Sequence, residues 1–387
     1  MFNNFILNMR TRVVFGKGTI SQLSKEVPEN AKVMVTYGGG SVFKNGVMEQ
    51  VRNALDGFEV IEFGGIEPNP GYETCMKAVK ICKEENVDFL LAVGGGSVID
   101  GTKFISNAAK YGGDNPWNIL LTRGKCCTGG IPVGVVLTLP ATGSEMNAGA
   151  VITKYDTQDK LDFDSEYSRP IFAILDPETT YSLPQRQTIN GIIDAFVHVA
   201  EQYLTYPVNA KIQDRFAEGI MLTLIEESKN VLENPQNYEA RANIMWSATM
   251  ALNNLIGAGV PQDWVSHFMG HELTAMFGID HGMTLAIVLP SLLEYTKTDK
   301  LEKLAQYGKR VWGVDEKDKS VCADKAIKAT RNFFEQLGAP THLSAYELDE
   351  KVIPALVDKL KEHNFYNMGE RKKLNPEDME KIYKMCI

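Results

Sequence analysis

Hydrophobic and polar positions divide the chain into two halves with different periodicity. In the first half, short apolar runs rich in Val, Ile, Leu and Phe are separated by longer stretches with helical spacing. The apolar runs, which are typical of buried strands, cover residues 33–37, 58–63, 89–93 and 133–139. Strands that alternate with helices, such as the helix expected over 72–86, predict right-handed crossovers and a parallel sheet covered on both faces.

The second half changes to long amphipathic or wholly apolar helices from about Pro184 onward. Helical spacing is found over residues 188–203, 210–227, 238–257, 265–277, 285–297, 324–337, 348–361 and 376–386. We therefore expect an α/β domain over residues 1–184 and an all-helical domain over residues 185–387. The break falls in the proline-containing stretch that ends at Pro184.

Composition and charge restrict the possible partners. Apolar residues make up 44% of the 387 residues and charged residues 23%, which is ordinary for a globular protein. The net charge of −9 and the lack of a long Lys/Arg run argue against nucleic-acid binding. The chain contains no run of 18 apolar residues, so we expect no membrane-spanning helix. The six cysteines form no CxxC pair, so we expect reduced thiols and a cytoplasmic protein.

Three clusters of turn-forming residues follow predicted strands. The strand at 89–93 runs into Gly94–Ser97 at the start of a helical stretch. Glycines there let the backbone approach a phosphate, and a helix N-terminus favours the phosphate charge. The other clusters are Gly38–Ser41 and the Thr- and Ser-containing segment 138–144. Ligands bind outside the carboxyl ends of such strands, although a structural turn remains the alternative explanation for each cluster.

The first glycine cluster bears on cofactor selectivity. In dinucleotide-binding folds, an acidic residue near such a strand end binds the ribose 2′-hydroxyl. No Asp or Glu occurs between Tyr37 and Val47, and Ser41 and Lys44 are present instead. This composition leaves room for a 2′-phosphate and predicts a preference for NADP over NAD, with a purely structural turn as the alternative.

Histidines carry the sharpest chemical signal. Four of the six lie between residues 198 and 281, and the two C-terminal ones are expected to be ordinary surface residues. Asp194 and His198 are spaced i, i+4 and share one helix face, and His267 and His271 repeat that spacing on a second helix. His281 follows in an expected turn. One carboxylate and two or three imidazoles suit a divalent transition metal with a position left for substrate oxygen; buried core histidines are the alternative.

Several longer motifs occur in order along the chain. They are Tyr37–Ser41, Glu67–Pro70, Gly94–Asp100, Ala141–Met146, Gly191–His198 with Glu201, and His267–Gly282. Together they resemble the iron-containing (group III) alcohol dehydrogenases over essentially the whole chain, and most of all the branch of butanol dehydrogenases and NADPH-dependent aldehyde reductases. The resemblance implies a dehydroquinate synthase-like fold, with a Rossmann-like dinucleotide-binding domain followed by an all-α metal-binding domain.

This resemblance also implies roles for particular residues. It places the ligands of an iron or zinc ion at Asp194, His198, His267 and His281. It places His271 near the nicotinamide and the substrate, as a catalytic residue and not as a ligand. The residues that the resemblance implies to bind the cofactor are Gly95, Gly96, Ser97, Asp100, Thr138, Thr142, Asn147 and Lys160. The first glycine cluster adds Gly38, Gly39 and Ser41 as candidates for the same role.

The expected activity is the interconversion of a primary alcohol such as butanol and its aldehyde, by hydride transfer with NADP(H) or less favourably NAD(H). Two alternative enzymes are a dehydroquinate synthase-like lyase and an NAD-preferring polyol dehydrogenase. A non-catalytic metal-binding protein would leave the glycine turns without a purpose. The β-rich segment 5–15 predicts an edge strand, and pairing of that strand between two copies would give a homodimer.

Overall fold

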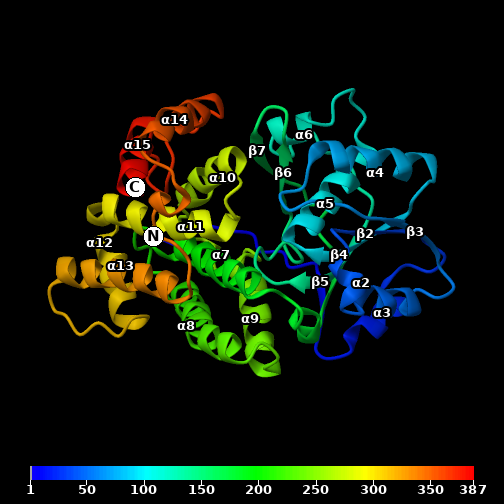
Figure 1. Cartoon of the computed structure of the whole chain (residues 1–387), viewed down its shortest axis with the longest axis horizontal. Coiled ribbons are helices and arrows are strands. Elements are labelled where there is room, and N and C mark those ends of the chain that lie inside the picture. The colour runs from blue at the N-terminus through cyan, green and yellow to red at the C-terminus, as the bar shows by residue number, and fades with distance from the viewer. Residues whose placement is uncertain (1) are drawn as a thin grey trace. The chain divides into compact units, whose positions relative to one another are not determined.

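The computed structural model describes residues 2–387, which divide into two compact units (Figure 1). The sheet unit consists of Asn8–Pro184 together with residues 233–249. The helical unit consists of residues 185–232 and 250–387 together with the segment that ends at Leu7. The N-terminal segment that ends at Leu7 thus belongs to the helical unit, and residues 233–249 of the second half belong to the sheet unit.

The sheet unit is built on six parallel strands. They are β1 (Arg12–Phe15), β2 (Lys32–Tyr37), β3 (Glu59–Phe63), β4 (Phe89–Gly95), β5 (Val133–Leu139) and β8 (Phe172–Leu175). Their order across the sheet is β1-β8-β5-β4-β2-β3, and every pair of neighbours is parallel. The parallel sheet predicted from the sequence is confirmed, and β2 to β5 are the four strands that the apolar runs predicted.

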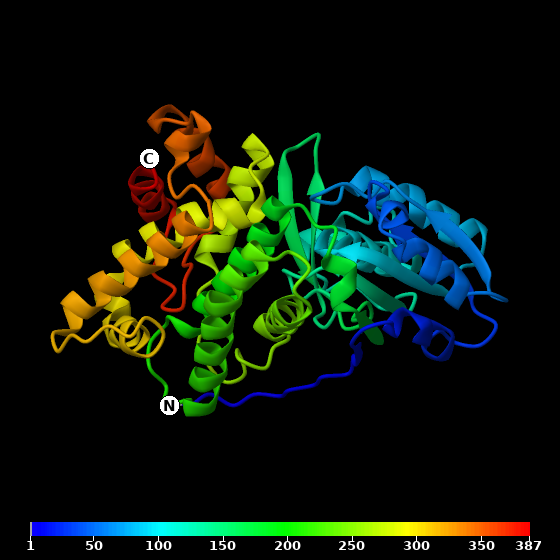
Figure 2. The same ribbon diagram turned by 60° about the horizontal axis from the view of Figure 1, so that its bottom comes forward.

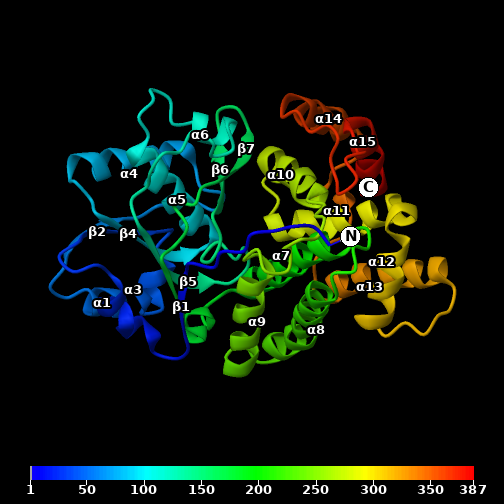
Figure 3. The ribbon, with the colours of Figure 1, turned by 180° about the vertical axis from the view of Figure 1, so that it is seen from behind.

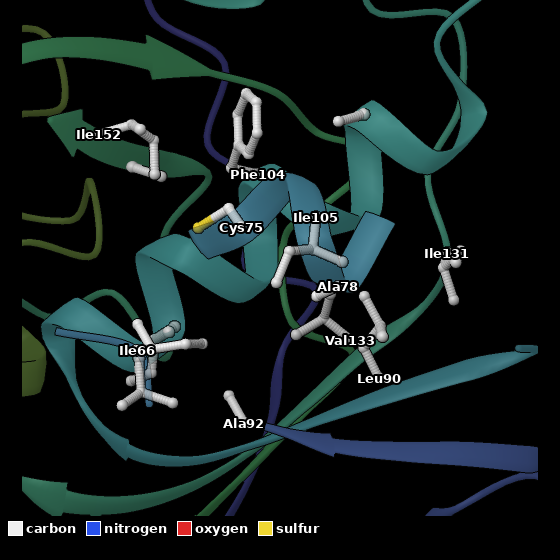
Figure 4. Packing of buried hydrophobic residues seen from close by; sticks show 14 of the residues in the cluster. Ile66, Cys75, Ala78, Leu90, Ala92, Phe104, Ile105, Ile131, Val133 and Ile152 are labelled. Atoms are coloured by element: carbon white, nitrogen blue, oxygen red, sulfur yellow. The ribbon is translucent and has the colours of Figure 1, made fainter. Parts of the chain in front are cut away.

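Side chains of the central strands alternate between two hydrophobic cores because successive residues of a strand point to opposite faces. Leu90 and Ala92 of β4 join the core under α4 (Tyr72–Glu84) and α5 (Gly96–Lys110), where Phe104 also lies (Figure 4). Phe89, Leu91 and Val93 join the core of the other face, with residues of α1 (Leu23–Glu26), α2 (Ser41–Lys44) and α3 (Val47–Ala54). Both faces of the sheet are therefore covered, which accounts for the nearly continuous apolar character of β4 and β5.

A two-stranded antiparallel hairpin, β6 (Gly149–Lys154) and β7 (Asp159–Asp164), follows β5 (Figure 2). The apolar pattern did not predict it, because β7 alternates charged and apolar residues and forms no apolar run. The short α6 (Asn118–Leu121) contacts β7. The hairpin also lies beside α5 and reaches the segment before α4, where Gly71 and Thr153 form a parallel bridge.

The predicted strand over residues 5–15 is wrong in its first part. Only Arg12–Phe15 form β1, which is visible at the edge of the sheet in Figure 3. The reason is the partner: β1 pairs with β8, and β8 is itself only four residues long. The preceding residues 5–10 are exposed.

The helical unit consists of long helices, as the sequence predicted. They are α7 (Gln185–Tyr203), α8 (Lys211–Glu233), α10 (Val265–Phe277), α11 (His281–Tyr295), α12 (Lys297–Arg310), α13 (Lys319–Gln336), α14 (Ile353–Glu362) and α15 (Pro376–Met385). The sequence did not predict α12, because its many charged residues leave only a narrow apolar stripe. Among the described residues, no helix combines the length and apolar character needed to cross a bilayer.

Two helices have bounds that differ from the sequence prediction. The helix α9 (Tyr238–Ala251) ends several residues before the predicted end at 257, and its Met245 lies in the core under α4 and α5. The helix α11 begins earlier than predicted, so His281 is its first residue and does not lie in a turn. The prediction of a turn at His281 was therefore wrong.

Candidate active site

Three helices of the helical unit bring four of the predicted site residues together. Asp194 and His198 project from α7, one turn apart. His267 lies in the first turn of α10, and His281 begins α11. Because α11 packs against both α7 and α10, residues 194, 198, 267 and 281 meet although up to 87 positions separate them in the sequence. All but His281 are buried.

The distances around Asp194 fit a metal site. Its Oδ1 lies 3.5 Å from His198 Nε2, 3.6 Å from His267 Nε2 and 3.6 Å from His281 Nε2. Ligands about 2.0–2.2 Å from a tetrahedral metal lie roughly 3.3–3.6 Å from one another. The candidate ligand atoms of residues 194, 267 and 281 also all lie within 4.8 Å of one another.

Two polar atoms at the centre of this cluster have no hydrogen-bond partner in the part of the chain that the structure describes. Asp194 Oδ1 and His267 Nε2 are both buried, and neither atom forms a hydrogen bond with another described residue. A buried polar atom without a partner is costly, and coordination of a cation removes that cost. One carboxylate and three imidazoles form a donor set that suits Fe²⁺ or Zn²⁺.

The electrostatics of the cluster favour positive charge at its centre. Burial alone would raise the pKa of Asp194, but the imidazoles of His198, His281 and His267 outweigh burial and hold the pKa well below its usual range. Burial would lower the pKa of His267, but the carboxylates of Glu201 and Asp194 outweigh it and raise the pKa to about 9. The two carboxylates therefore stabilise a cation, whether a proton or a metal, among the imidazoles.

The position of His281 depends on a close approach of α11 to α7. A Cβ on Gly282 would lie 2.6 Å from the backbone oxygen of Asn190, so that only glycine fits at this contact. Asn190 Nδ2 donates to Asp280 Oδ2 at 2.9 Å, and Arg186 forms an ion pair with the same oxygen at 2.6 Å. These contacts hold the residue before His281 against α7.

His271 lies next to the cluster around Asp194. It is buried on α10, one turn after His267, and its ring centre lies 5.2 Å from that of His281. The i, i+4 spacing thus places His271 on the same side of α10 as His267 but further along the helix. A position next to the ligands suits a group that exchanges a proton with substrate.

The prediction that both C-terminal histidines are surface residues was wrong for His363. Its side chain is only 6% exposed, and its Nδ1 lies 2.7 Å from Glu272 Oε1. The sequence around it is polar, but α14, which ends just before it, packs against α10 and buries it. His342 is partly buried beside Arg331.

In the sheet unit, the three predicted turn clusters lie at the edge formed by the carboxyl ends of the parallel strands. They follow β2, β4 and β5, which are neighbouring parallel strands, so their carboxyl ends coincide. The chain runs outward from β2 to β3 on one side and from β4 to β5 on the other. The gap between the ends of β2 and β4 is therefore the topological switch point, where open α/β sheets bind ligands.

Several predicted cofactor residues contact one another at this edge. Asn69 connects two of them: its backbone N–H donates to Ser97 Oγ at 3.3 Å, and its Oδ1 accepts from Lys160 Nζ at 2.9 Å. Gly96 begins α5 and lies so close to Thr142 that a Cβ would meet the threonine side chain at 2.5 Å. Asn69 was missed as a site residue, although its place in the motif Glu67–Pro70 was a signal.

Two other predicted cofactor residues, Asp100 and Asn147, have protein partners below this edge. Asp100 accepts from Ser144 Oγ at 2.6 Å and from the Val151 N–H at 2.9 Å. The fully buried Lys103, which the sequence reasoning missed, donates to Asn147 Oδ1 at 3.0 Å and to Ser144 Oγ at 2.8 Å. Its i+3 spacing from Asp100 was the available signal. These contacts hold the loop between β5 and β6 on α5.

The remaining predicted cofactor residues lie near the ends of β2 and β5. Gly38 follows β2, Ser41 begins α2, and Thr138 is the buried penultimate residue of β5. Gly95 ends β4 beside Leu139. A Cβ on Gly39 would meet no atom within 4 Å, so this position borders open space.

Two family models match nearly the whole chain. The model of iron-containing alcohol dehydrogenase matches residues 10–177, and the model of the C-terminal part of the Fe-containing alcohol dehydrogenase family matches residues 188–387. The chain belongs to the iron-containing alcohol dehydrogenase family. The resemblance inferred from the sequence motifs is thereby confirmed.

Individual relatives of this family share the full length. The NADPH-dependent aldehyde reductase YqhD of Escherichia coli (strain K12) is 59% identical over 382 residues, covering 98% of this chain and 99% of that protein. The NADH-dependent butanol dehydrogenase A of Clostridium acetobutylicum is 38% identical over 386 residues, covering 98% and 99%. The crystal structure of the E. coli protein matches with a TM-score of 0.99 and 58% identity, covering 100% of this chain and 99% of that one.

The metal centre can be tested by removing one imidazole. We expect His267→Ala to lose stoichiometric metal, because only three of the four candidate ligands remain, the Asp194 carboxylate and the imidazoles of His198 and His281. The measurement is the metal content of purified protein by mass spectrometry, with circular dichroism to show that the helices persist. His342→Ala, which removes an imidazole far along the chain from the cluster, is the control and should keep its metal. Full occupancy in His267→Ala would contradict the ligand set.

Proposed function

We propose that this protein is a metal-dependent oxidoreductase that interconverts primary alcohols and aldehydes of the butanol type with NADP(H). The observation that carries the proposal is the buried carboxylate–triple imidazole cluster around Asp194. Support comes from two relatives, one named an NADPH-dependent aldehyde reductase and the other an NADH-dependent butanol dehydrogenase. The family to which this chain belongs, that of the iron-containing alcohol dehydrogenases, agrees with these names.

In this proposal, Asp194, His198, His267 and His281 hold a single Fe²⁺ or Zn²⁺ ion, which polarises the substrate oxygen as a Lewis acid, while NADPH supplies the hydride. The chain positions the ligands and limits water around them. Trp264 contributes to that limit, because its ring centre lies 5.4 Å from that of His267. His271 exchanges a proton with the substrate oxygen, since it is the nearest further imidazole to His281.

The composition of the ligand-bearing helices favours an uncharged substrate over the polyanionic substrate of a dehydroquinate synthase-like lyase. Neither α10 nor α11 contains Lys or Arg, and the single such residue of α7, Arg186, is paired with Asp280. A site for a polyanion needs several such side chains. Short aliphatic alcohols and aldehydes need none, which is why we favour the oxidoreductase.

The activity is tested by following NADPH absorbance with butanal. We expect oxidation of NADPH that stops after chelation of the metal and returns on addition of Fe²⁺ or Zn²⁺. A second assay with NADH and a polyol separates the polyol dehydrogenase. No turnover of butanal with either cofactor and either metal would overturn the proposed function, and lyase activity without net NADPH oxidation would replace it.

Cofactor preference is expected to depend on Gly39. We expect Gly39→Asp to weaken NADPH relative to NADH by about one to two orders of magnitude, because a carboxylate beside the 2′-phosphate removes a contact worth about 1.5–3 kcal/mol. The open space around Gly39 accommodates the new side chain. The measurement is kcat/KM for both cofactors with butanal.

The neutral variant Gly39→Asn has nearly the same size and serves as the matched control. It should keep most of the NADPH preference if charge, and not bulk, decides the selectivity. A preference for NADH in the unaltered protein would contradict this explanation outright.

His271 is expected to affect rate and not metal content. We expect His271→Ala to lower kcat by about 10²–10⁴-fold, the typical contribution of a positioned proton donor, while metal stays stoichiometric. Parallel measurement of kcat and metal content checks both statements. An empty metal site in this variant would mean that His271 is a ligand.

We further propose that the protein acts in the cytoplasm as a two-fold dimer. The six cysteines are all free thiols, as a reducing compartment requires. The N-terminal segment exposes five large apolar side chains, at residues 2, 5, 6, 7 and 9, with Ile6 97% exposed. Such an exposed apolar segment is typical of an interface, and the same segment on a second copy would cover it isologously.

The dimer can be tested by light scattering at micromolar concentration. We expect a mass of two chains for the unaltered protein and a shift toward one chain for Ile6→Glu, which places a charge in the covered segment. Leu121→Glu, at another exposed apolar position, is the control and should stay dimeric. A monomeric unaltered protein would count against the proposal.

A further inference from the structure

The carboxylate of Glu201 joins the two helices that carry most of the candidate ligands. Glu201 lies on α7, seven residues after Asp194 and three after His198, so it shares their side of the helix. Its side chain is buried. Oε1 accepts a hydrogen bond from the Ser266 N–H at 2.7 Å, and Oε2 contacts His267 Nδ1.

The first of these contacts replaces a missing helix cap. The first N–H groups of a helix have no partner within the helix, and the residue before α10, Trp264, provides no side-chain cap. The Glu201 carboxylate takes the place of a cap from another helix. Its negative charge at the N-terminus of α10 is also favourable for the helix dipole.

The second contact decides which nitrogen of His267 carries a proton. A carboxylate accepts hydrogen bonds but donates none, so His267 must hold a proton on Nδ1. In the neutral imidazole, the form that coordinates a metal, Nε2 then has the free lone pair, and this nitrogen lies 3.6 Å from Asp194 Oδ1. Ligating histidines commonly donate their other N–H to a carboxylate in this way.

We propose that Glu201 is a positioning residue of the metal centre, which holds His267 in the tautomer and orientation that present Nε2 to the metal. This inference rests on the metal site of the proposed function. Glu201 itself touches neither metal nor substrate, and acts through His267.

The surrounding contacts make this role separable from a purely structural one. The backbone oxygen of Glu201 accepts from the Asp263 N–H at 2.9 Å, and Asp263 Oδ1 accepts from the Val265 N–H at 3.1 Å. Asp263 is fixed in turn by the buried Lys300, whose Nζ donates to Oδ2 at 2.5 Å. The start of α10 therefore stays anchored when only the end of the Glu201 side chain changes.

Glu201→Gln is the variant that tests the proposal. Glutamine keeps the size of the side chain and one oxygen acceptor, but replaces the other oxygen by a donor. If the amide nitrogen faces His267, Nδ1 must accept and the proton moves to Nε2, which blocks coordination. If the amide turns over, the nitrogen faces the Ser266 N–H and that hydrogen bond is lost.

The control is a second buried glutamate–histidine pair in the same unit. Glu272, also on α10, lies with its Oε1 2.7 Å from His363 Nδ1, and neither residue is a candidate ligand. Glu272→Gln thus removes the same charge and the same kind of contact from a buried histidine. Any general effect of such a substitution on the helical unit appears in both variants.

The readouts are the Zn²⁺ dissociation constant, from competition with a chromophoric chelator, and the visible absorption spectrum of Co²⁺-substituted protein. We expect Glu201→Gln to bind Zn²⁺ about 10- to 100-fold more weakly and to change the Co²⁺ spectrum, whereas Glu272→Gln binds as the unaltered protein does. Equal Zn²⁺ affinity of Glu201→Gln and the unaltered protein would overturn the inference, as would an equal loss in both variants.

These outcomes are distinct from failure of the proposed function, in which the unaltered protein itself would bind no stoichiometric metal. If Glu201→Gln does not fold, the tautomer can be read in the unaltered Zn²⁺-loaded protein from long-range ¹H–¹⁵N spectra of its histidines. We expect His267 to carry its proton on Nδ1. An unprotonated Nδ1 would overturn the inference without any variant.

Discussion

The helical unit depends on one buried negative charge, the carboxylate of Asp194. A buried carboxylate is tolerated only where opposite charge and polar partners surround it, and here three imidazoles approach the same oxygen within 3.6 Å. That requirement sets how closely α7, α10 and α11 must pack, and it explains glycine at position 282, where a side chain would separate α11 from α7. The metal-binding chemistry and the packing of these helices are thus the same constraint.

The sheet unit meets a comparable constraint through a single helix, α5. Its N-terminus forms the glycine turn at the switch point of the sheet, and its next turn carries Asp100 and Lys103. These two side chains hold the loop after β5, which bears Thr142 and Asn147. One helix therefore forms the glycine turn after β4 and also holds the loop after β5.

Much of this architecture was accessible from periodicity alone. Buried strands and helices can be recognised in the sequence. A strand buried on both faces has a continuous apolar run, and a helix buried on one face has apolar residues at helical spacing. Three of the failures share a feature. The local sequences of β6–β7, α12 and His363 resemble those of surface elements, yet these parts pack against α5, α13 and α10.

For the site, the sequence by itself determined the donor types and their local pairing. Asp194 with His198, and His267 with His271, follow from helical spacing, which is a property of the backbone within one turn. Only the tertiary structure decided that His281 begins a helix beside Asp194 and that Glu201 faces His267. These relations depend on how three helices cross, and crossing geometry is set by side-chain packing over many residues and not by any local pattern.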